Sequence, residues 1–551
     1  MNAPFEARPR VCLISAKNLY RITRVVRQAR ALRDGGYSVT VYCKGLPQED
    51  LLATAAGVRF VAFSDADLAR LKREDIDQAM RDASLDLLPP SLERFCAFLL
   101  RFRQFGYKFF RALEVSLLRL RKPSRPTSAS AAKADAAMSG APAKKSAAQK
   151  LRFDPFGAIG GYLRRISIAH LGWWKQAHPD RESPIQPSDY ENQTTIDLMF
   201  FCLLYLTRSI RHAQFAASVL NHVESELKAG IPAPGIVHAH DTHSIVAGDS
   251  VATALGAKFV YDAVEISGHQ FRLNGRMAKW TSPVDVVYRR LERLIAARAD
   301  RMTTIGESLA DWFQQNYTVK SAVVPIRNTR DYEPPQRDMR IRQDCGLDAN
   351  VPLLFWCGNA SAHRGLELII DLLPHVPEFH AVFVTEFKES WEEYRQSLIQ
   401  RIADNGVGDR VHIVPMRPPN DVVAYASGAD IGVVAGAKDS PLNILYCLPN
   451  KFHEMVMARL PIAATHLVNI QMLIREHGNG CEIDEDRFDE AAAMLRDLIA
   501  RRRDGTLDAK LESAARALSW QNDGARLVEV YNSITSDIRS ERASAVTLSS
   551  G

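Results

Sequence analysis

Short apolar runs alternate with amphipathic stretches over much of the chain. Near the start, the run VCLIS is followed by ITRVVRQARALRDGG, whose apolar residues recur at helical spacing and which ends in Gly35 and Gly36, and then by SVTVY. Such runs predict buried strands, and the amphipathic stretch predicts a helix that covers a sheet. The order strand, helix, strand is typical of a doubly wound α/β domain, and VRFVAF predicts a third strand.

The same alternation returns twice more. It resumes at GIVHAH and continues to SAVVPIRNTRDY, and a second set runs from PLLFWCG through DIGVVAG to LPIAAT. We therefore predict an α/β fold with two doubly wound, Rossmann-like domains. Residues 1–75 and 230–325 would form the first domain and residues 326–515 the second, followed by a helix and polar tail over residues 516–551.

A helical insertion is predicted at residues 76–229 of the first domain. Aromatic and basic residues interleave over residues 91–175, around an Ala/Ser/Pro/Lys-rich stretch at residues 122–150 that we expect to be disordered. An apolar helix is expected from Thr195 to Leu227. Residues 94–175 carry 17 basic and 3 acidic side chains, whereas the whole chain has a net charge of +6.

The insertion allows two interpretations. Interleaved aromatic and basic side chains suit helices that lie on an anionic membrane surface. The alternative is a helical hairpin packed on the first domain, with arginines reaching outward to water. We favour the membrane surface. Nucleic acid is not an expected partner, because the segment is too apolar.

Length and composition narrow the class of protein. The chain has 551 residues and is 46% hydrophobic, which predicts more than one domain. We identify no signal peptide and no apolar run of about 18 residues. The eight cysteines are scattered without a C-x-x-C pair, as in reduced cytoplasmic proteins. The sequence therefore predicts a cytoplasmic protein, with the inner face of the cytoplasmic membrane as a second place of residence.

One stretch, LPNKFHEMVMARLPIAAT, combines a buried helix with polar residues at its start. Asn450, Lys451 and Glu454 fall in what we expect to be the first turn, beyond the end of a buried strand. Ligands of open α/β sheets bind at this edge, and a helix N-terminus favours an anionic group. A carboxylate can accept bonds from sugar hydroxyls, and a lysine can meet a phosphate, so the stretch suits a nucleotide sugar. The alternative is a carboxylate that only caps the helix.

The same stretch resembles the PNKxxEYxxxxxPV element of family 4-like glycosyltransferases of the GT-B fold. WCGNASAHRGLELII resembles their diphosphate loop, VHIVPMRPPNDVVAYASGADIGVVA their base-binding segment, and SWQNDGARLVEVY the C-terminal helix that crosses back. The resemblance implies a metal-independent glycosyltransferase without a cofactor. It would move a sugar, with retained configuration, from a nucleotide sugar to a glycan or lipid-linked acceptor in bacterial surface polysaccharide synthesis.

The resemblance also assigns roles to residues. Glu454 matches the glutamate that binds the donor ribose, and Arg364 the basic residue that neutralises the leaving diphosphate. On the acceptor side, Glu265 or His240 is the expected catalytic partner, with His269 as the alternative. The remaining residues expected at the donor are Gly358, Asn359, Gly365, Met416, Arg417, Ser440, Asn443, Asn450 and Lys451.

Three positions depart from the family pattern. Tyr446 stands where many members have a first glutamate, Asn359 where an arginine is usual, and Val264 where a histidine faces the reaction centre. Two other functions therefore stay open. One is a nucleotide-sugar-binding assembly protein that has lost catalysis, and the other is a nucleotide-sugar epimerase on the same fold.

Three other polar clusters have simpler interpretations. His238 and His240 in HAHDTH would share one face of a strand, but no further metal ligands are evident, so no metal site is expected. In SDAD, Ser64 or Asp65 is expected to cap a helix rather than bind a metal. The last cluster is expected in a loop that faces the acceptor or solvent: Lys17, Asn18, Arg21 and Arg24.

Overall fold

The structure is a computed structural model of the 551-residue chain. It describes residues 8–72 and 195–549 and a few residues of 74–78, with gaps at residues 21, 267–282, 362–363, 388–390, 437, 439 and 441. Most of the predicted insertion, including residues 91–175 and the stretch at 122–150, lies outside the described residues, as does His269.

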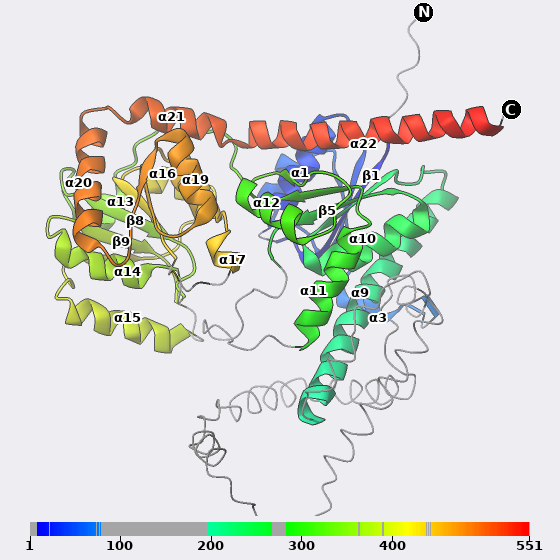
Figure 1. Ribbon diagram of the computed structural model, residues 1–551, viewed down its shortest axis with the longest axis horizontal. Helices are drawn as coiled ribbons and strands as arrows, with labels where there is room; N and C mark the ends of the chain where they lie inside the picture. Colours follow the sequence, from blue (N-terminus) through cyan, green and yellow to red (C-terminus); the bar gives the residue numbers. More distant parts are fainter. Residues whose placement is uncertain are drawn as a thin grey trace, which may run out of the picture. The chain divides into compact units, whose positions relative to one another are not determined.

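The first sheet has seven parallel strands in the order β3-β2-β1-β4-β5-β6-β7 (Figure 1). The chain therefore reverses its direction of winding between β1 and β4, which is the doubly wound arrangement. The strands are β1 Val11–Asn18, β2 Val39–Gly45, β3 Arg59–Ala62, β4 Ile236–His240, β5 Lys258–Ala263, β6 Arg301–Thr304 and β7 Val324–Pro325.

The second sheet repeats this order with six parallel strands, β10-β9-β8-β11-β12-β13. Its reversal lies between β8 and β11. The strands are β8 Leu353–Cys357, β9 His380–Val384, β10 Val411–Val414, β11 Ile431–Val434, β12 Ile462–Ala464 and β13 Gly480–Glu482. The predicted fold class, two doubly wound domains, is confirmed.

Helices connect the strands of both sheets. Those of the first part are α1 Thr23–Asp34, α2 Glu49–Thr54, α3 Asp65–Ala69, α9 Thr195–Lys228, α10 Thr242–Leu255, α11 Pro283–Ala296 and α12 Glu307–Asn316. Those of the second part are α13 Arg340–Cys345, α14 Leu366–Leu372, a short 3₁₀ turn at Leu373–His375, α15 Glu392–Asp404, α16 Val422–Ala426, α17 Leu442–Leu445, α18 Asn450–Met457, α19 Val468–His477, α20 Phe488–Arg503, α21 Asp508–Ala517 and α22 Trp520–Ser549.

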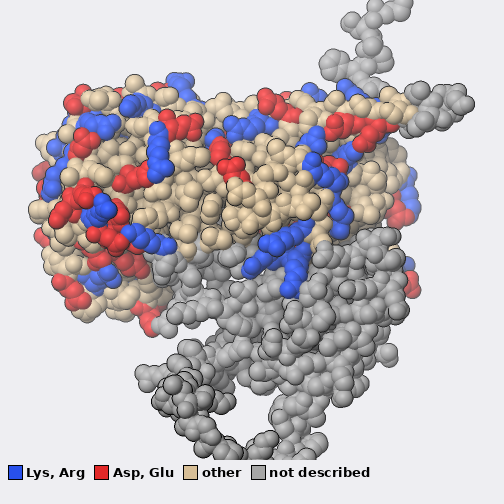
Figure 2. Space-filling model, in the orientation of Figure 1, with Lys and Arg blue, Asp and Glu red and all other residues tan. Residues whose placement is uncertain are grey.

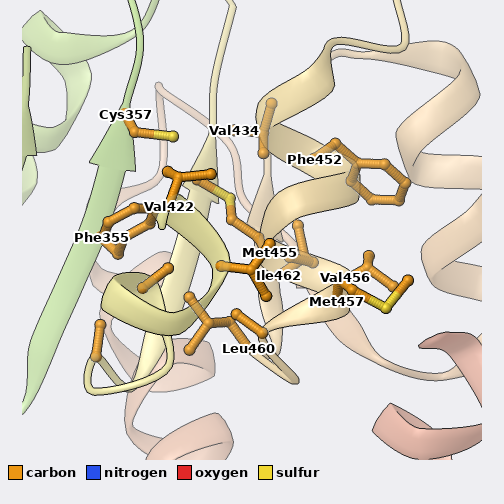
Figure 3. Close-up of a cluster of buried hydrophobic side chains, with 14 of the residues drawn as sticks. Phe355, Cys357, Val422, Val434, Phe452, Met455, Val456, Met457, Leu460 and Ile462 are labelled. Carbon is orange, nitrogen blue, oxygen red and sulfur yellow. The ribbon is translucent and has the colours of Figure 1, made fainter. Parts of the chain in front are cut away.

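Strand β8 shows why the apolar runs are uninterrupted. Successive side chains of a strand point to opposite faces of the sheet. Phe355 and Cys357 enter the core on one face, together with α18, whereas Leu354 and Trp356 enter the core on the other face. Because helices cover both faces, every residue of the strand must be apolar. Figure 3 shows the first of these cores, between the strands and α18.

Helix α18 carries the stretch that combines apolar and polar residues. Phe452, Met455, Val456 and Met457 are all buried in the core of the second sheet (Figure 3). Glu454 is the fifth residue of the helix, so it begins the second turn rather than lying in the first turn as expected. The apolar residues therefore hold the helix in place by packing, and its polar residues are available to line a binding site.

Helix α22 belongs to the core of the first sheet. Its side chains Trp520, Leu527, Tyr531 and Ile534 are buried with residues of β1 and α1. The Tyr531 hydroxyl is 2.7 Å from Nδ1 of His238 in β4. The helix continues to Ser549, so it includes most of the segment that we expected to form a polar tail after it.

Helix α9 is joined to the first sheet by a buried carboxylate. Glu226, which is 4% exposed, pairs with Arg10 before β1 and with Arg59 in β3. Tyr42 donates a hydrogen bond to it at 3.3 Å. The C-terminal part of α9 is thereby held against the sheet.

Two sequence interpretations at the start of the first domain can be compared with the structure. Ser64 caps α3 with Asp67 in a reciprocal capping box, as expected. The predicted loop after the first strand is wrong in part, because Lys17 and Asn18 still belong to β1 and Arg24 lies within α1, 4% exposed. Arg24 is held there by a buried ion pair with Asp262.

Figure 2 shows acidic and basic side chains intermixed over much of the visible face of the described chain, and a group of basic side chains at its lower edge. No helix that the structure describes is both long and apolar enough to cross a bilayer.

Candidate functional site

A cavity of about 300 Å³ opens where the strands of the second sheet end. It lies beside the C-terminal ends of β8 and β9 and the start of α18, which follows β11. This is the reversal point of a doubly wound sheet, where such folds bind ligands. The cavity is lined by Trp356, Cys357, Gly358, Asn359, Arg364, Val384, Met416, Arg417, Pro419, Val422, Pro449, Asn450, Lys451 and Glu454.

Most of the residues predicted for a donor site come together in this cavity. Gly365, Ser440 and Asn443 are not among its lining residues. Ser440 is buried and its hydroxyl has no partner in the described chain, while Oδ1 of Asn443 accepts a hydrogen bond from the Ile266 amide at 2.5 Å. The predicted residues that do line the cavity are Gly358, Asn359, Arg364, Met416, Arg417, Asn450, Lys451 and Glu454.

Gly365 shapes the loop behind Arg364. It is the N-cap of α14 with φ +84°, a left-handed conformation that side chains rarely adopt. A Cβ atom at this position would lie 2.2 Å from Cβ of Ala435. A glycine is therefore required for the loop to approach β11 this closely.

Two cations line the cavity without a carboxylate partner. Among the described residues, neither Arg364 nor Lys451 has a carboxylate oxygen within salt-bridge distance, and Nε of Arg364 is buried without a hydrogen bond. Lys451 is 8% exposed, with its ammonium 4.4 Å from the centre of the Trp356 ring. Burial, reinforced by the charge of Arg364, lowers the pKa of Lys451 to about 8. The two side chains repel each other and would both be stabilised by an anion.

Glu454 lies on the same wall of the cavity. The Cys357 thiol donates a hydrogen bond to its Oε2 at 3.7 Å, and Nη1 of Arg330 lies 3.6 Å from Oε1. Burial raises the pKa of Glu454, and the charge of Arg330 opposes that rise. A carboxylate with two oxygens offers more acceptor positions than these contacts use. It can therefore also accept bonds from hydroxyl groups of a ligand.

The apolar part of the cavity lining suits a flat ring. Met416 is 40% exposed, and Pro419 and Val422 add apolar surface. The Arg417 guanidinium lies 4.1 Å from the centre of the Tyr425 ring and pairs with Asp344. The lining of the cavity thus combines apolar side chains, cations and a carboxylate.

A second polar cluster lies where the strands of the first sheet end. Asp262 is fully buried in β5 and accepts hydrogen bonds from Arg24 at 2.6 and 2.9 Å and from Thr303 at 2.8 Å. Nδ1 of His240 lies 2.8 Å from the same carboxylate. Burial would raise the pKa of Asp262, but the charge of Arg24 holds it well below its usual range. The carboxylate therefore fixes the orientation of the His240 ring.

The neighbouring residues of this edge have different surroundings. Glu265 is exposed, two residues beyond the end of β5. His238 is fully buried against Tyr531, and burial lowers its pKa to about 4. Asp241 has φ +71°, which is rare for a residue with a side chain, and pairs with Lys17. Nδ1 of His238 thus faces the Tyr531 hydroxyl, and Nδ1 of His240 faces the Asp262 carboxylate.

Known proteins with a similar sequence are distant. No family model matches the chain. The D-inositol 3-phosphate glycosyltransferase of Nocardia farcinica is 22% identical over 284 residues, which are 49% of this chain and 60% of that protein. The chain thus matches less than two thirds of the length of this relative.

Solved structures with a similar fold match almost the entire chain. Anabaena HepE in complex with UDP and glucose has a TM-score of 0.51 at 12% identity, covering 96% of this chain and 100% of its own. A glycosyltransferase from Rickettsia africae has a TM-score of 0.51 at 10% identity, covering 96% and 98%. The chain has the GT-B fold. The resemblance to GT-B glycosyltransferases inferred from the sequence is confirmed.

In this GT-B chain, each domain places polar residues where its strands end. The lining of the second-domain cavity includes residues that the sequence did not suggest, among them Trp356, Cys357 and Pro419. Arg330, which contacts Glu454 from outside the lining, was also not suggested. Trp356 and Cys357 belong to an apolar run that predicts only a buried strand and no binding site. Arg330 lies 124 residues before Glu454, and no local pattern signals that contact.

Proposed function

We propose that the protein is a glycosyltransferase that transfers a sugar from a nucleotide sugar to an acceptor. The observation that carries the proposal is the pair of cations, Arg364 and Lys451, without carboxylate partners in the described chain, beside Glu454 in one cavity. The diphosphate of a donor would lie at the two cations and its ribose at the Glu454 carboxylate. Its base would lie against the apolar part of the lining.

The charges of the cavity suit the proposed chemistry. Breaking the bond between the sugar and the diphosphate develops negative charge on the leaving group. Arg364 and Lys451 are placed to stabilise that charge, because fixed cations in a water-poor site need little reorganisation. Glu454 would hold the ribose by accepting its hydroxyl hydrogens. The reaction then requires neither a metal nor a cofactor, and the resemblance to the family favours retention of configuration.

The acceptor side would lie at the end of the first sheet. His240, held by Asp262, is the group we propose to face the acceptor hydroxyl, with exposed Glu265 as the second candidate. A glycan or a lipid-linked sugar is the proposed acceptor, in bacterial surface polysaccharide synthesis. The basic and aromatic residues 91–175 would bring the protein to an anionic membrane surface from the cytoplasmic side.

A binding experiment tests the donor site. The protein is titrated calorimetrically with UDP-, GDP-, ADP- and CMP-sugars, with UDP-glucose first because HepE was solved with UDP and glucose. We expect one nucleotide class to bind and Arg364→Ala and Glu454→Ala to weaken it at least tenfold, or about 1.4 kcal/mol. Arg340→Ala, which removes an exposed arginine paired with Asp338 and Asp421, is the matched control and should bind normally. A folded protein that binds none of the four would refute the proposal.

A nucleotide-sugar-binding assembly protein without catalysis is the second candidate. Val264, Tyr446 and Asn359 favour it, because they replace the histidine, glutamate and arginine of the family pattern. Release of sugar from the bound donor, with or without an added acceptor, separates the two. Donor turnover that is lost in Arg364→Ala would establish the enzyme, whereas tight binding without turnover would establish the assembly protein.

A further inference from the structure

The linker between the two sheets contacts Glu454, a lining residue of the cavity, through Arg330. Its side chain is 15% exposed, and Nη1 lies 3.6 Å from Oε1 of Glu454. Nη2 lies 3.6 Å from a carboxylate oxygen of Glu333, and Nε is buried without a hydrogen-bond partner. The guanidinium is thus held near two carboxylates at distances too long for hydrogen bonds, with one donor unused.

The backbone of the same linker is bonded to the start of α22. The Trp520 amide donates to the Arg330 carbonyl at 2.7 Å. The Asp523 carboxylate accepts from the Arg327 amide at 3.2 Å and from the Thr329 hydroxyl at 3.0 Å. Because α22 packs in the core of the first sheet, a shift of the linker would also displace residues of that core.

The linker is also bonded to α1 and to α18. Arg27 of α1 donates to the Thr329 carbonyl at 2.7 Å, and Nδ2 of Asn328 donates to Oδ1 of Asn450 at 2.6 Å. Asn450 and Glu454 both line the cavity. Three helices, α1, α18 and α22, therefore contact the linker, and two of its contacts end on residues of the proposed donor site.

We propose that Arg330 is a positioning residue that aligns the Glu454 carboxylate for the donor ribose and tightens the linker when the donor binds. The inference rests on the proposed function, since it needs a ribose at Glu454. Ribose hydroxyls would fix the carboxylate, which would draw Arg330 from 3.6 Å into hydrogen-bond distance. Hydrogen bonds of the linker and the start of α22 would then open less often, although neither segment lines the cavity.

Hydrogen exchange of the full-length protein, with and without saturating UDP, tests this inference. The reporting amides are those of Arg327, Trp520 and Tyr332, whose hydrogen bonds join the linker to α22. We expect UDP to slow their exchange about threefold or more, and to slow exchange in the cavity loop at residues 358–365 as well.

Three variants separate positioning from general stability. In Arg330→Gln, UDP should still protect the cavity loop but no longer the linker amides. Arg330→Lys keeps the charge and should restore part of the linker response. Arg30→Gln removes the ion pair of α1 with Asp331 in the same linker and leaves the contact with Glu454 intact, so its response should match the wild type.

The outcomes also separate this inference from the function on which it rests. Absence of protection in the wild-type cavity loop would mean that no nucleotide binds there, so the proposed function fails. Protection of the cavity loop with unchanged or faster exchange in the linker overturns the role of Arg330 alone. So does a linker response that persists in Arg330→Gln.

Discussion

At the scale of single residues, Lys451 is the most unusual side chain of the cavity. Lys451 is only 8% exposed, and its ammonium lies over an indole ring and near another cation, so desolvation disfavours its charge. Among the described residues, no carboxylate lies within salt-bridge distance to offset this cost. Such an arrangement is stable only because the rest of the fold holds it. An anionic ligand would relieve it, which is why the residue matters for binding.

The lowered pKa of Lys451 makes donor affinity depend on pH. Its pKa of about 8 in the free protein means that the ammonium is lost as pH rises through that value. A bound diphosphate favours the charged form, so affinity for the nucleotide sugar should fall by up to tenfold per pH unit above about pH 8. Calorimetry between about pH 6.5 and 9 measures this slope.

Two variants serve as controls for the pH dependence. Lys451→Arg keeps its charge over the whole range, so binding should not vary with pH. Lys451→Met should bind weakly and also without pH dependence. A wild-type affinity that stays constant between about pH 7 and 9 would contradict the assignment of Lys451 to the diphosphate.

The candidate site was predictable where its residues share a local pattern. Asn450, Lys451 and Glu454 stand together at the start of one helix, so the sequence alone brings them to one place. Arg330 and Cys357 reach Glu454 only through the packing of separate segments. Arg24 was misplaced for the same reason, because its buried partner Asp262 lies 238 residues away.

At the scale of elements, the hydrophobic periodicity of the sequence predicted which helices and strands exist better than it predicted where they begin and end. The predicted apolar helix from Thr195 to Leu227 and the observed α9 agree closely, because a long pattern averages out local exceptions. The predicted strand at Leu460 to Ala464 begins two residues later, at Ile462. Burial without strand pairing accounts for the difference, since Leu460 is also fully buried.

The attachment of α9 depends on one charge. Burial would raise the pKa of Glu226, but the hydrogen bond and charge of Arg10 lower it, so the carboxylate stabilises the fold above its unfolded pKa and loses this effect as pH falls. Glu226→Gln leaves Arg10 buried without its partner charge and should lower the free energy of unfolding by about 3 kcal/mol.

Urea denaturation at neutral pH measures the effect of Glu226→Gln. Glu224→Gln is the matched control, because Glu224 pairs with Lys228 on the exposed face of the same helix. Its urea midpoint should equal that of the wild type. Equal midpoints for both variants would show that the buried pair does not hold the helix.

At the scale of the whole molecule, the first core is built from both ends of the chain. Leu527 of α22 is fully buried and packs with residues of β1 and α1. Leu527→Ala should lower the free energy of unfolding by about 2 to 5 kcal/mol, because it leaves a cavity in a closed core.

Denaturation with a probe in each domain tests this prediction. Ile399→Ala, at a residue of α15 that is 40% exposed, is the matched control and should change stability far less. If Leu527→Ala unfolds no more readily than Ile399→Ala, α22 is not part of the first core in solution.

The place of α22 in the sequence has a consequence for synthesis on the ribosome. Strands β8 to β13 and their helices are complete within the first 518 residues, so the cores of the second sheet need no part of α22. The first sheet, although it is made earlier, must wait for Tyr531 and Ile534 to cover its core. The domain translated first is thus the one that finishes last, and during that interval its apolar face is exposed to chaperones and to neighbouring nascent chains.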